Sequence, residues 1–346
     1  MPMNLELSPL DDFDLSISNT WSINRSGSMV HRPTGLRIGH EGIQQEGKDP
    51  EVEHHPAIQI LPQDVTVDYS GKGRLGGGAG GTVFKGVHMP SNSPLAIKLV
   101  NVGDRDRRAQ MLSDVRTLMQ AQGCANLIHL YSAYIGKEDS SKVCIVLEFM
   151  DYGSLGTLRS RVPAGTGVPE HHLACISKQT LNGLECLHKL GAIHRDIKPD
   201  NVLVNRQGEV KLTDFGLAKD VKESCDIAMT YVGTQLYMSP ERVLGKGCAF
   251  SGDVWSLGMV VYELAKEFPF PRGATFPQLF EHVCSKPEPR LDPSEFSPAL
   301  CDFAAGCLTR DEEARWGVHT LLESPFVSAV DVPSASRDFA AYLAET

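Results

Sequence analysis

Apolar residues follow two different spacings along the chain, and the change between them divides the sequence into two parts. Between about residues 65 and 150, short runs of β-branched and aliphatic residues alternate with glycine-rich or polar turns, which is typical of an antiparallel sheet. One helical stretch interrupts these runs near residues 107–120, where Met111, Val115 and Leu118 follow helical spacing. The predicted strands lie at residues 65–69, 82–87, 95–100, 127–135 and 143–147.

After Gly153 the spacing becomes helical. In residues 171–190 one stripe collects Leu173, Ile176, Thr180, Leu184 and Leu187. Residues 252–267 are largely apolar on all sides, which indicates a buried helix. Further helices are predicted at residues 276–284, 298–308 and 318–323. Because the strands come first and the helices later, the pattern predicts an α+β chain with two lobes.

Residues 1–64 differ from both parts. They are low in aromatic residues and rich in Ser, Pro, Gly, His and acidic residues, and only short apolar segments interrupt them. Such a composition buries too little apolar surface to offset the entropy of ordering the chain. We therefore predict a mostly flexible extension with one or two strands.

The composition excludes several classes of protein. With 346 residues, the chain is long enough for two domains or for one large enzyme domain with a tail. Its 33 Lys and Arg residues against 43 Asp and Glu residues give a net charge of −10, which argues against binding to nucleic acid or to a membrane through a basic surface. No run approaches the ~18 apolar residues of a membrane span, and the N-terminal residues lack the features of a secretory signal. We expect a soluble intracellular protein.

The cysteines give no sign of a metal or redox site. There are nine of them, scattered along the chain, and no C-x-x-C pair is present. That pair is the spacing that zinc ribbons and redox dithiols use. We therefore expect free thiols in a reducing compartment.

A glycine-rich loop lies between two of the predicted strands. Gly76, Gly78 and Gly81 form a G-x-G-x-x-G pattern, followed by Val83. Glycines let backbone N–H groups approach phosphate oxygens because no Cβ atom intervenes. The loop joins two strands, unlike a dinucleotide-binding fingerprint, and it lacks the G-K-[ST] ending of a P-loop. With these two motifs excluded, the pattern predicts a hairpin that covers the phosphates of a nucleotide. A flexible turn without a ligand is the alternative.

A lysine and an acidic residue follow at positions that suit the same nucleotide. Lys98 stands near the end of the predicted strand at residues 95–100, from which its ammonium group can reach phosphate oxygens. Such a lysine needs an acidic partner on a nearby helix, and Asp114 on the predicted helix is the candidate. Aspartate is one methylene shorter than glutamate, so this ion pair would be longer or bridged by water. A surface carboxylate is the alternative interpretation of Asp114.

The segment His-Arg-Asp-Ile-Lys-Pro-Asp-Asn at residues 194–201 carries the strongest chemical signal. Asp196 can accept the proton of an attacking hydroxyl group, and Lys198 can neutralise a phosphoryl group in transfer. Asn201 offers an amide oxygen to a hard cation, and Asp214 of the following Asp-Phe-Gly triplet offers a carboxylate oxygen. These residue types at this spacing favour transfer of a phosphoryl group with the help of Mg²⁺.

Together these motifs resemble those of eukaryotic protein kinases over about residues 65–327. Several segments are similar to one group, the mitogen-activated protein (MAP) kinase kinases. They are the predicted hinge at residues 148–155, the run at 201–216, the Val-Gly-Thr-Gln-Leu-Tyr-Met-Ser-Pro-Glu loop at 232–241 and the tail at 337–343. The chain therefore resembles the MAP kinase kinases, which are also called the STE7-like family.

The resemblance implies a two-lobed protein kinase fold. The N-lobe, residues 65–150, would hold an antiparallel five-stranded sheet with one helix, and the C-lobe, residues 151–327, would be mainly helical. The kinase domain would thus span residues 65–327. It would be preceded by the extension at residues 1–64 and followed by a tail at residues 328–346 that contains a short helix.

The resemblance also implies ATP and Mg²⁺ as cofactors and assigns residues to them. The backbone of Glu148 and Met150 would hold adenine, with Leu147 as the gatekeeper. Asp253 would anchor the catalytic loop, and Glu241 would pair with Arg315. The implied catalytic residues are Asp196, Lys198 and Lys98; the nucleotide site adds Leu75, Gly76, Gly78, Gly81, Val83, Ala96, Glu148 and Met150; the metal ligands are Asn201 and Asp214.

Activation would depend on hydroxyl groups between the Asp-Phe-Gly triplet and residue 232. The family is switched by phosphorylation there, and Ser224 and Thr230 are the candidates. A phosphate adds about −1.5 to −2 of charge, which could pair with Arg195 and order the segment. With the other spacing found in the family, Asp226 would take the first position as a fixed charge. Asp114 would be a further regulatory residue, since its helix must bring it to Lys98.

The implied function is that of a dual-specificity kinase, which transfers the γ-phosphoryl group of ATP to Thr and Tyr in the activation loop of a MAP kinase. A Ser/Thr kinase that acts further upstream and a catalytically weak scaffold are the alternatives; Gly80 and Asp114, which depart from the family pattern, favour the scaffold. The expected partners are a MAP kinase substrate and an upstream MAP kinase kinase kinase, without nucleic acid or membrane. The expected location is the cytoplasm, with the nucleus as an addition.

Overall fold

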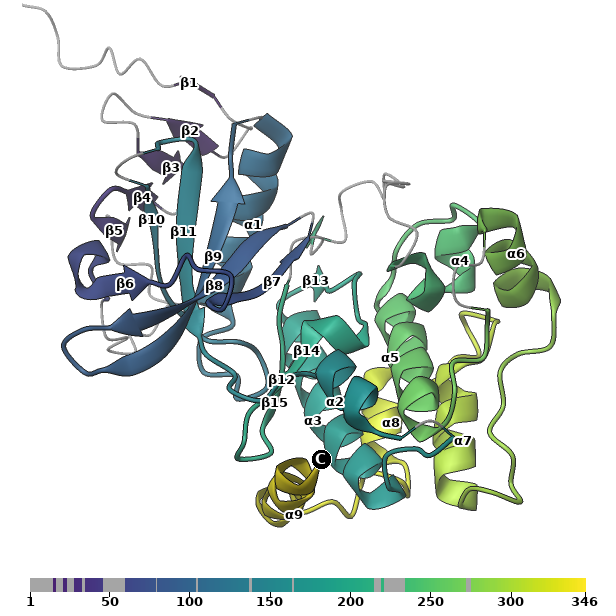
Figure 1. The fold of residues 1–346 in the computed structure, drawn as a ribbon. Helices are drawn as coiled ribbons and strands as arrows, with labels where there is room; N and C mark the ends of the chain where they lie inside the picture. The colour runs from purple at the N-terminus through teal and green to yellow at the C-terminus, as the bar shows by residue number, and fades with distance from the viewer. Residues whose placement is uncertain are drawn as a thin grey trace, which may run out of the picture. The chain divides into compact units, whose positions relative to one another are not determined.

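The computed structural model describes most of the chain from residue 60 onward and shorter segments before it. The chain divides into two compact units, which we call the N-terminal unit (Met1–Met119 and His129–Phe149) and the C-terminal unit (Gln120–Ile128 and Met150–Thr346). Figure 1 labels most of their helices and strands. Among the described residues, no helix has both the length and the apolar character needed to cross a membrane. The described residues are 15–16, 21–23, 28–32, 35–45, 60–78, 80–103, 105–136, 139–163, 165–214, 219–220, 234–271 and 275–346.

The N-terminal unit contains the predicted antiparallel sheet and the predicted helix, which is α1 (Arg105–Gln120). The strands of the sheet are β6 (Val65–Val67), β7 (Arg74–Gly78), β8 (Gly81–His88), β9 (Ser93–Asn101), β10 (Leu130–Ile135) and β11 (Lys142–Glu148). Five of them follow the order β10-β11-β9-β8-β6, and β7 pairs with β8 beside this path. Part of the predicted glycine loop is therefore the strand β7.

The two faces of this sheet carry different residues because successive side chains of a strand alternate. Leu95 and Ile97 of β9 pack with Val146 of β11 and with Ile60 in one apolar cluster. Ala96 and Lys98, the residues in the alternate register of β9, belong to the opposite face. Burial of the first face thus fixes the register that presents Lys98 on the second.

A second sheet precedes the kinase-like strands and differs from the sequence prediction. Its strands are β1 (Leu15–Ser16), β2 (Trp21–Ile23), β3 (Met29–His31), β4 (Leu36–Gly39) and β5 (Gly42–Gln45), paired in that order. Met29, Leu36 and Ile38 are buried, and both β4 and β5 contact β10. We expected one or two strands in this extension, and the described residues form five. The edge of the larger sheet supplies a surface on which two of these strands, β4 and β5, pack.

The C-terminal unit is mainly helical, as predicted. Its helices are α2 (Leu155–Arg161), α3 (Glu170–Lys189), α4 (Pro240–Val243), α5 (Phe250–Ala265), α6 (Phe276–Phe280), α7 (Pro298–Cys307), α8 (Val318–Glu323) and α9 (Val332–Glu345). A π-helical turn, Glu281–Ser285, extends α6. The predicted helices at 171–190, 252–267, 276–284, 298–308 and 318–323 correspond to α3, α5, α6 with this turn, α7 and α8.

Short strands and turns complete this unit. They are the three-stranded set β12 (Gly153–Ser154), β14 (Val202–Val204) and β15 (Val210–Leu212), the pair β13 (Ala192–Ile193) and β16 (Lys219–Asp220), and 3₁₀ turns at Pro199–Asn201 and Thr234–Tyr237. Helix α3 contacts α5, α8, α9 and β15, and its predicted apolar stripe is buried throughout. The core of the unit therefore forms around α3.

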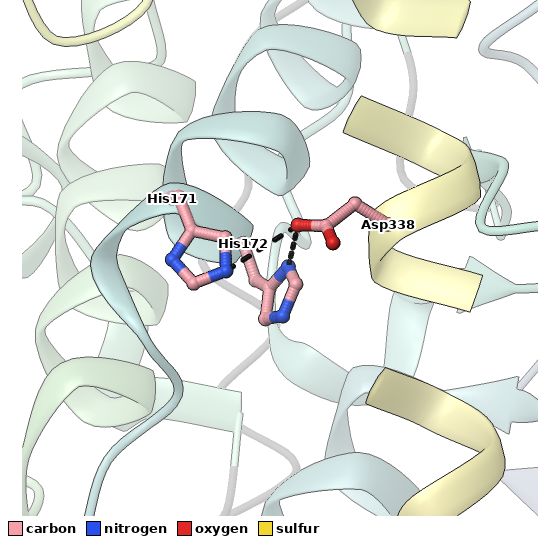
Figure 2. Close-up of side chains that lie close together, drawn as sticks. All are labelled: His171, His172 and Asp338. Carbon is pink, nitrogen blue, oxygen red and sulfur yellow. Dashed lines mark ion pairs between the residues drawn. The ribbon is translucent and has the colours of Figure 1, made fainter. Parts of the chain in front are cut away.

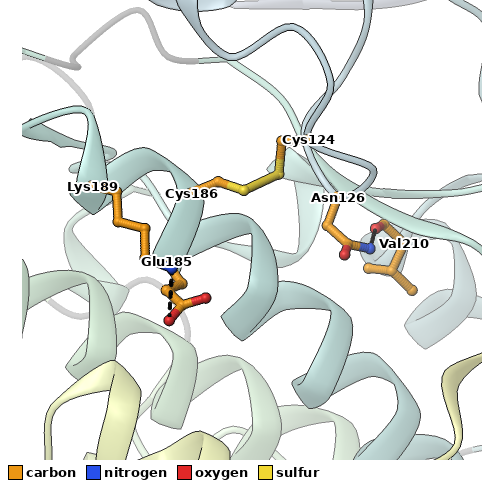
Figure 3. The surroundings of a disulfide bond; sticks show 6 residues. All are labelled: Cys124, Asn126, Glu185, Cys186, Lys189 and Val210. Atoms are coloured by element: carbon orange, nitrogen blue, oxygen red, sulfur yellow. Dashed lines mark hydrogen bonds and ion pairs between the residues drawn. A yellow bond between two sulfur atoms is a disulfide. The ribbon is translucent and has the colours of Figure 1, made fainter.

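A disulfide bond contradicts the expectation that all the cysteines are free thiols. Cys124, in the loop after α1, is bonded to Cys186 in the last turns of α3, with the two Cα atoms 6.5 Å apart (Figure 3). Beside it, Asn126 donates a hydrogen bond to the carbonyl oxygen of Val210 at 2.9 Å. The expectation was wrong because the two cysteines are 62 residues apart in sequence, and only the fold brings them together. Cys144, Cys175, Cys284, Cys301 and Cys307 carry free thiols.

Candidate active site

The catalytic segment of the C-terminal unit is held by one buried carboxylate. Asp253 of α5 accepts hydrogen bonds from the backbone N–H groups of His194 and Arg195, each at 2.9 Å, and from His188 Nε2 at 2.9 Å. Burial by itself would raise the pKa of Asp253, but the hydrogen bonds from His188 and from the Arg195 N–H favour the ionised form, and this pKa lies below its ordinary value. The ionised carboxylate therefore fixes the backbone just before Asp196.

Asp196 lies next to the two residues that were predicted to act with it. Lys198 Nζ and Asn201 Nδ2 each donate to Asp196 Oδ2 at 2.8 Å, and Asn201 Nδ2 also reaches the Asp196 carbonyl oxygen at 2.8 Å. Asp196 Oδ1 is buried and has no hydrogen-bond partner among the described residues. One carboxylate oxygen is thus held by two donors, and the other remains able to accept a proton from a hydroxyl group.

The residue before Asp214 is tied to the same segment. The Thr213 N–H donates to the Asn201 carbonyl oxygen at 3.0 Å, and the Thr213 carbonyl oxygen lies 3.0 Å from His194 Nε2. Burial lowers the pKa of His194 and keeps its ring neutral, so Nε2 donates to Thr213 while Nδ1 accepts from the Asp196 N–H at 3.3 Å. Asn201 and Asp214, the predicted metal ligands, are therefore positioned by one hydrogen-bonded network.

The backbone of this site is strained at two positions. Arg195 has a φ of 67° and Asp214 a φ of 65°, in the left-handed region that side chains with a Cβ atom rarely adopt. Such conformations persist only where surrounding contacts hold them, and they are concentrated at functional sites. At Arg195 the contacts are the Asp253 bond to its N–H and a bond from Arg242 Nη1 to its carbonyl oxygen at 2.6 Å.

The predicted pair of Glu241 and Arg315 is present in the C-terminal unit. The guanidinium group donates to both carboxylate oxygens, at 2.8 and 2.9 Å, and lies over the ring of Trp255. Burial would raise the pKa of Glu241, but the hydrogen bonds from Arg315 outweigh it and lower this pKa. The two-pronged geometry fixes α4, which follows the predicted activation segment, to the loop that carries Arg315.

In the N-terminal unit, the register of the sheet gathers residues that were predicted to bind nucleotide. Val83 pairs with Gly76 on one side and with Lys98 on the other, and Ala96 pairs with Leu147. Directly paired residues, and residues two apart on one strand, share a face of the sheet. Val83, Ala96 and Lys98 are thus placed on the same face.

The glycine hairpin requires glycine at one position for steric reasons. Gly81 has a φ of 125°, and a Cβ atom there would lie 2.3 Å from the carbonyl oxygen of Leu99. At Gly76 a Cβ atom would meet nothing within 4 Å. Leu75 is exposed at the point where the register shifts between Arg74 and Gly76. At Gly81 the β7–β8 hairpin therefore approaches the backbone of β9 too closely for a side chain.

Asp114 is not the surface carboxylate that we kept as an alternative. It is 9% exposed on α1, in the same unit as Lys98, which is 8% exposed. Two ionisable groups this deeply buried are expected to interact with polar partners, because an isolated buried charge is unstable. The burial of both residues favours the functional interpretation of Asp114.

The remaining predicted residues fall into two groups. The Glu148 N–H donates to the His129 carbonyl oxygen at 3.0 Å, and the His129 N–H donates to Glu148 Oε2 at 3.3 Å. Met150 is buried at the start of the second segment of the C-terminal unit. Ser224, Asp226 and Thr230, as well as Phe215 and Gly216, lie outside the described residues. Arg242 and His188, which fix the catalytic segment, were not predicted, because no local motif marks a residue that acts on a loop distant in sequence.

Comparisons with known proteins agree with this geometry. The protein kinase domain family matches residues 69–327. The chain is 32% identical to mitogen-activated protein kinase kinase 3 of Arabidopsis thaliana over 335 residues, 93% of this chain but only 64% of that protein's length. It is 32% identical to mitogen-activated protein kinase kinase SIPKK of Nicotiana tabacum, covering 95% and 91% of the two chains, and 34% identical to mitogen-activated protein kinase kinase 2 of Arabidopsis thaliana, covering 86% and 82%.

The fold, the motifs and the relatives lead to one family. The two units have the sheet and the helices of the two-lobed protein kinase fold, and the family match covers most of the chain. Two relatives, of which this chain covers 91% and 82%, are both named mitogen-activated protein kinase kinases. The chain is an ATP-dependent protein kinase and belongs to the mitogen-activated protein kinase kinase family.

Proposed function

We propose that this chain is a dual-specificity MAP kinase kinase, which transfers the γ-phosphoryl group of ATP to a threonine and a tyrosine in the activation loop of a MAP kinase. The observation that carries the proposal is the arrangement at Asp196: Lys198 and Asn201 hold Oδ2, and Oδ1 is buried with no hydrogen-bond partner in the part of the chain that the structure describes. The names of the relatives support the class of substrate.

The residues of the catalytic segment divide the work of phosphoryl transfer. Asp196 orients the substrate hydroxyl group and accepts its proton at Oδ1 as the oxygen attacks phosphorus. Lys198 lies 2.8 Å from Asp196 Oδ2, from where its charge can stabilise the phosphoryl oxygens in the transition state. The hydroxyl group of a tyrosine lies farther from the backbone than that of a threonine. Asp196 would serve as the base for both, and the position of the substrate loop would decide which hydroxyl group reaches it.

Asn201 and Asp214 fit a magnesium ion. Both of the hydrogen bonds from the Asn201 amide to Asp196 use Nδ2, which leaves Oδ1 for a cation, and Asp214 contributes a carboxylate. Oxygen donors of this kind suit Mg²⁺. The ion would neutralise phosphate charge, while the network through Thr213 keeps its two protein ligands in place.

We also propose that phosphorylation of Thr230, with Ser224 or the fixed charge of Asp226 at the first position, switches the kinase on. The support is the position of these residues between Asp214 and the paired Glu241, together with Arg195 of the catalytic segment as a cationic partner. A phosphate group adds about two negative charges and pairs well with arginine. An upstream MAP kinase kinase kinase would supply this modification.

The test of catalysis compares Asp196→Asn with the wild-type chain, using ATP and a catalytically inactive MAP kinase as substrate. Loss of the proton acceptor should lower kcat by about 10²- to 10⁴-fold, with ATP binding retained. Asp302→Asn removes an exposed carboxylate of α7 and serves as the matched control. Equal rates for Asp196→Asn and the wild type would refute the role of Asp196, and absence of transfer by a wild-type chain that carries phosphate on Thr230 would favour a scaffold.

A further inference from the structure

Two histidines and a carboxylate meet on the surface of the C-terminal unit, away from the catalytic segment. His171 and His172 lie in the first turn of α3, and Asp338 lies on α9 (Figure 2). One ligand atom from each of the three residues lies within 4.8 Å of the others. In the part of the chain that the structure describes, this is the one group of three such side chains that could hold a metal ion.

The spacing of these atoms is close to what zinc requires. A tetrahedral zinc ion with bonds of ~2.0–2.1 Å places neighbouring ligand atoms about 3.4 Å apart. His171 Nε2 lies 3.4 Å from Asp338 Oδ2, and His172 Nδ1 lies 3.8 Å from the same oxygen. Figure 2 shows both rings directed at this carboxylate. Small side-chain movements would complete the geometry.

The exposure of two of the three side chains suits an ion that enters from solvent. His171 and Asp338 are 64% and 63% exposed, so both can adjust, whereas His172 is 5% exposed. The His172 ring packs against Phe339 and Tyr342 of α9, with centroids 5.5 and 4.6 Å away. One ligand is thus fixed by packing, and two adaptable ligands lie at the surface.

The two imidazole rings lie close together as well as close to the carboxylate. Their centroids are 3.9 Å apart. Both rings therefore converge on one oxygen of Asp338, as the ligands of a single ion would.

We propose that His171 Nε2, His172 Nδ1 and a carboxylate oxygen of Asp338 form a zinc-binding site, with water in the fourth position. Imidazole ligands favour Zn²⁺ over Mg²⁺, which prefers oxygen donors. The ion would join α9 to α3. Helix α9 lies beyond the residues that match the kinase domain family, and Phe339 and a 3.3 Å bond from Gln179 to Ser336 already attach it to the unit. The site would add a metal-dependent attachment for this C-terminal helix.

The test is a calorimetric titration of the full-length, untagged chain with Zn²⁺ at pH 7.5 in millimolar Mg²⁺. It compares the wild type with His171→Ala, Asp338→Asn and the control His319→Ala. His319 forms an exposed pair with Glu323 at 3.4 Å, with side chains 82% and 69% exposed and no third ligand in the described part of the chain. Thiols and active-site oxygens contribute equally to all four proteins, so differences between them report on the cluster alone.

We expect one zinc ion that binds wild type and His319→Ala equally, and binds His171→Ala and Asp338→Asn at least about 10-fold more weakly. Zinc should also raise the midpoint temperature of thermal unfolding of the wild type and of His319→Ala, but not that of His171→Ala or Asp338→Asn. Equal affinity in all four proteins would overturn the proposal. Displacement of the zinc by Mg²⁺ would overturn it as well, because that ion would then occupy oxygen ligands elsewhere.

Discussion

At the scale of single residues, the catalytic segment depends on hydrogen bonds that arrive from outside it. Asp253 holds the backbone of His194 and Arg195, and Arg242 holds the Arg195 carbonyl oxygen, so that Arg195 keeps a strained φ of 67°. These contacts are needed because a residue with a Cβ atom in this conformation costs about 1–3 kcal/mol of free energy. The position of Asp196 is therefore set by residues that take no part in proton transfer.

Asp253→Asn tests this dependence. The His194 and Arg195 N–H groups donate to different oxygens of Asp253. The variant replaces one of these oxygens with an NH₂ group, so one of the two N–H groups loses its acceptor. We expect the free energy of unfolding to fall by about 1–3 kcal/mol and kcat to fall together with it. Urea unfolding and a single-turnover assay measure the two effects on the same protein. A variant with unchanged kcat would show that Asp196 is positioned without Asp253.

At the scale of elements, the β7–β8 hairpin and the loop before β10 show how the chain restricts its own geometry. The hairpin approaches β9 at Gly81, where a Cβ atom would lie 2.3 Å from Leu99. The loop after α1 is bonded to α3 through Cys124 and Cys186. Neither constraint follows from the spacing of apolar residues, because each depends on a contact between segments that meet only in the fold.

Gly81→Ala should disturb the β7–β8 hairpin, and Gly76→Ala is the matched control for its effect on stability. Alanine at position 81 must adopt a φ of 125° and meets backbone atoms of β9, whereas alanine at position 76 has open space. We expect Gly81→Ala to lose about 1–3 kcal/mol of stability and to raise the KM for ATP several-fold. Steady-state kinetics and thermal unfolding provide both values. Similar losses in the two variants would mean that the hairpin is sensitive to any side chain.

The disulfide bond should stabilise the C-terminal unit. Closing a loop of about 62 residues restricts the unfolded chain and contributes up to about 4 kcal/mol. The double variant Cys124→Ser/Cys186→Ser should therefore unfold at lower denaturant concentration than the wild type under oxidising conditions. In the presence of a thiol reductant, the two proteins should unfold alike. A difference that persists after reduction would assign the effect to packing of the serine side chains instead.

At the scale of the whole molecule, the sequence predicted features that depend on neighbouring residues better than contacts between segments that are distant in sequence. The apolar stripe from Leu173 to Leu187 predicted α3. The motif around Asp196 also predicted the residues that bind it, because Lys198 and Asn201 lie within five residues of Asp196 in sequence. The number of strands in the sheet β1–β5 was underestimated, because β4 and β5 pack against β10, a contact that their own composition does not indicate. The Cys124–Cys186 bond and the hydrogen bond from Arg242 to Arg195 join segments that are distant in sequence, and no local pattern predicts them.

The central claim is that this kinase transfers phosphate to both a threonine and a tyrosine of one activation loop. The most direct measurement incubates the wild-type chain, with Thr230 phosphorylated by an upstream kinase, with ATP, Mg²⁺ and a catalytically inactive MAP kinase, and maps the modified residues by mass spectrometry. The account predicts phosphate on the Thr and the Tyr of the same loop, and on neither when Asp196→Asn is used. Phosphate on serine or threonine alone, with the tyrosine unmodified, would contradict it.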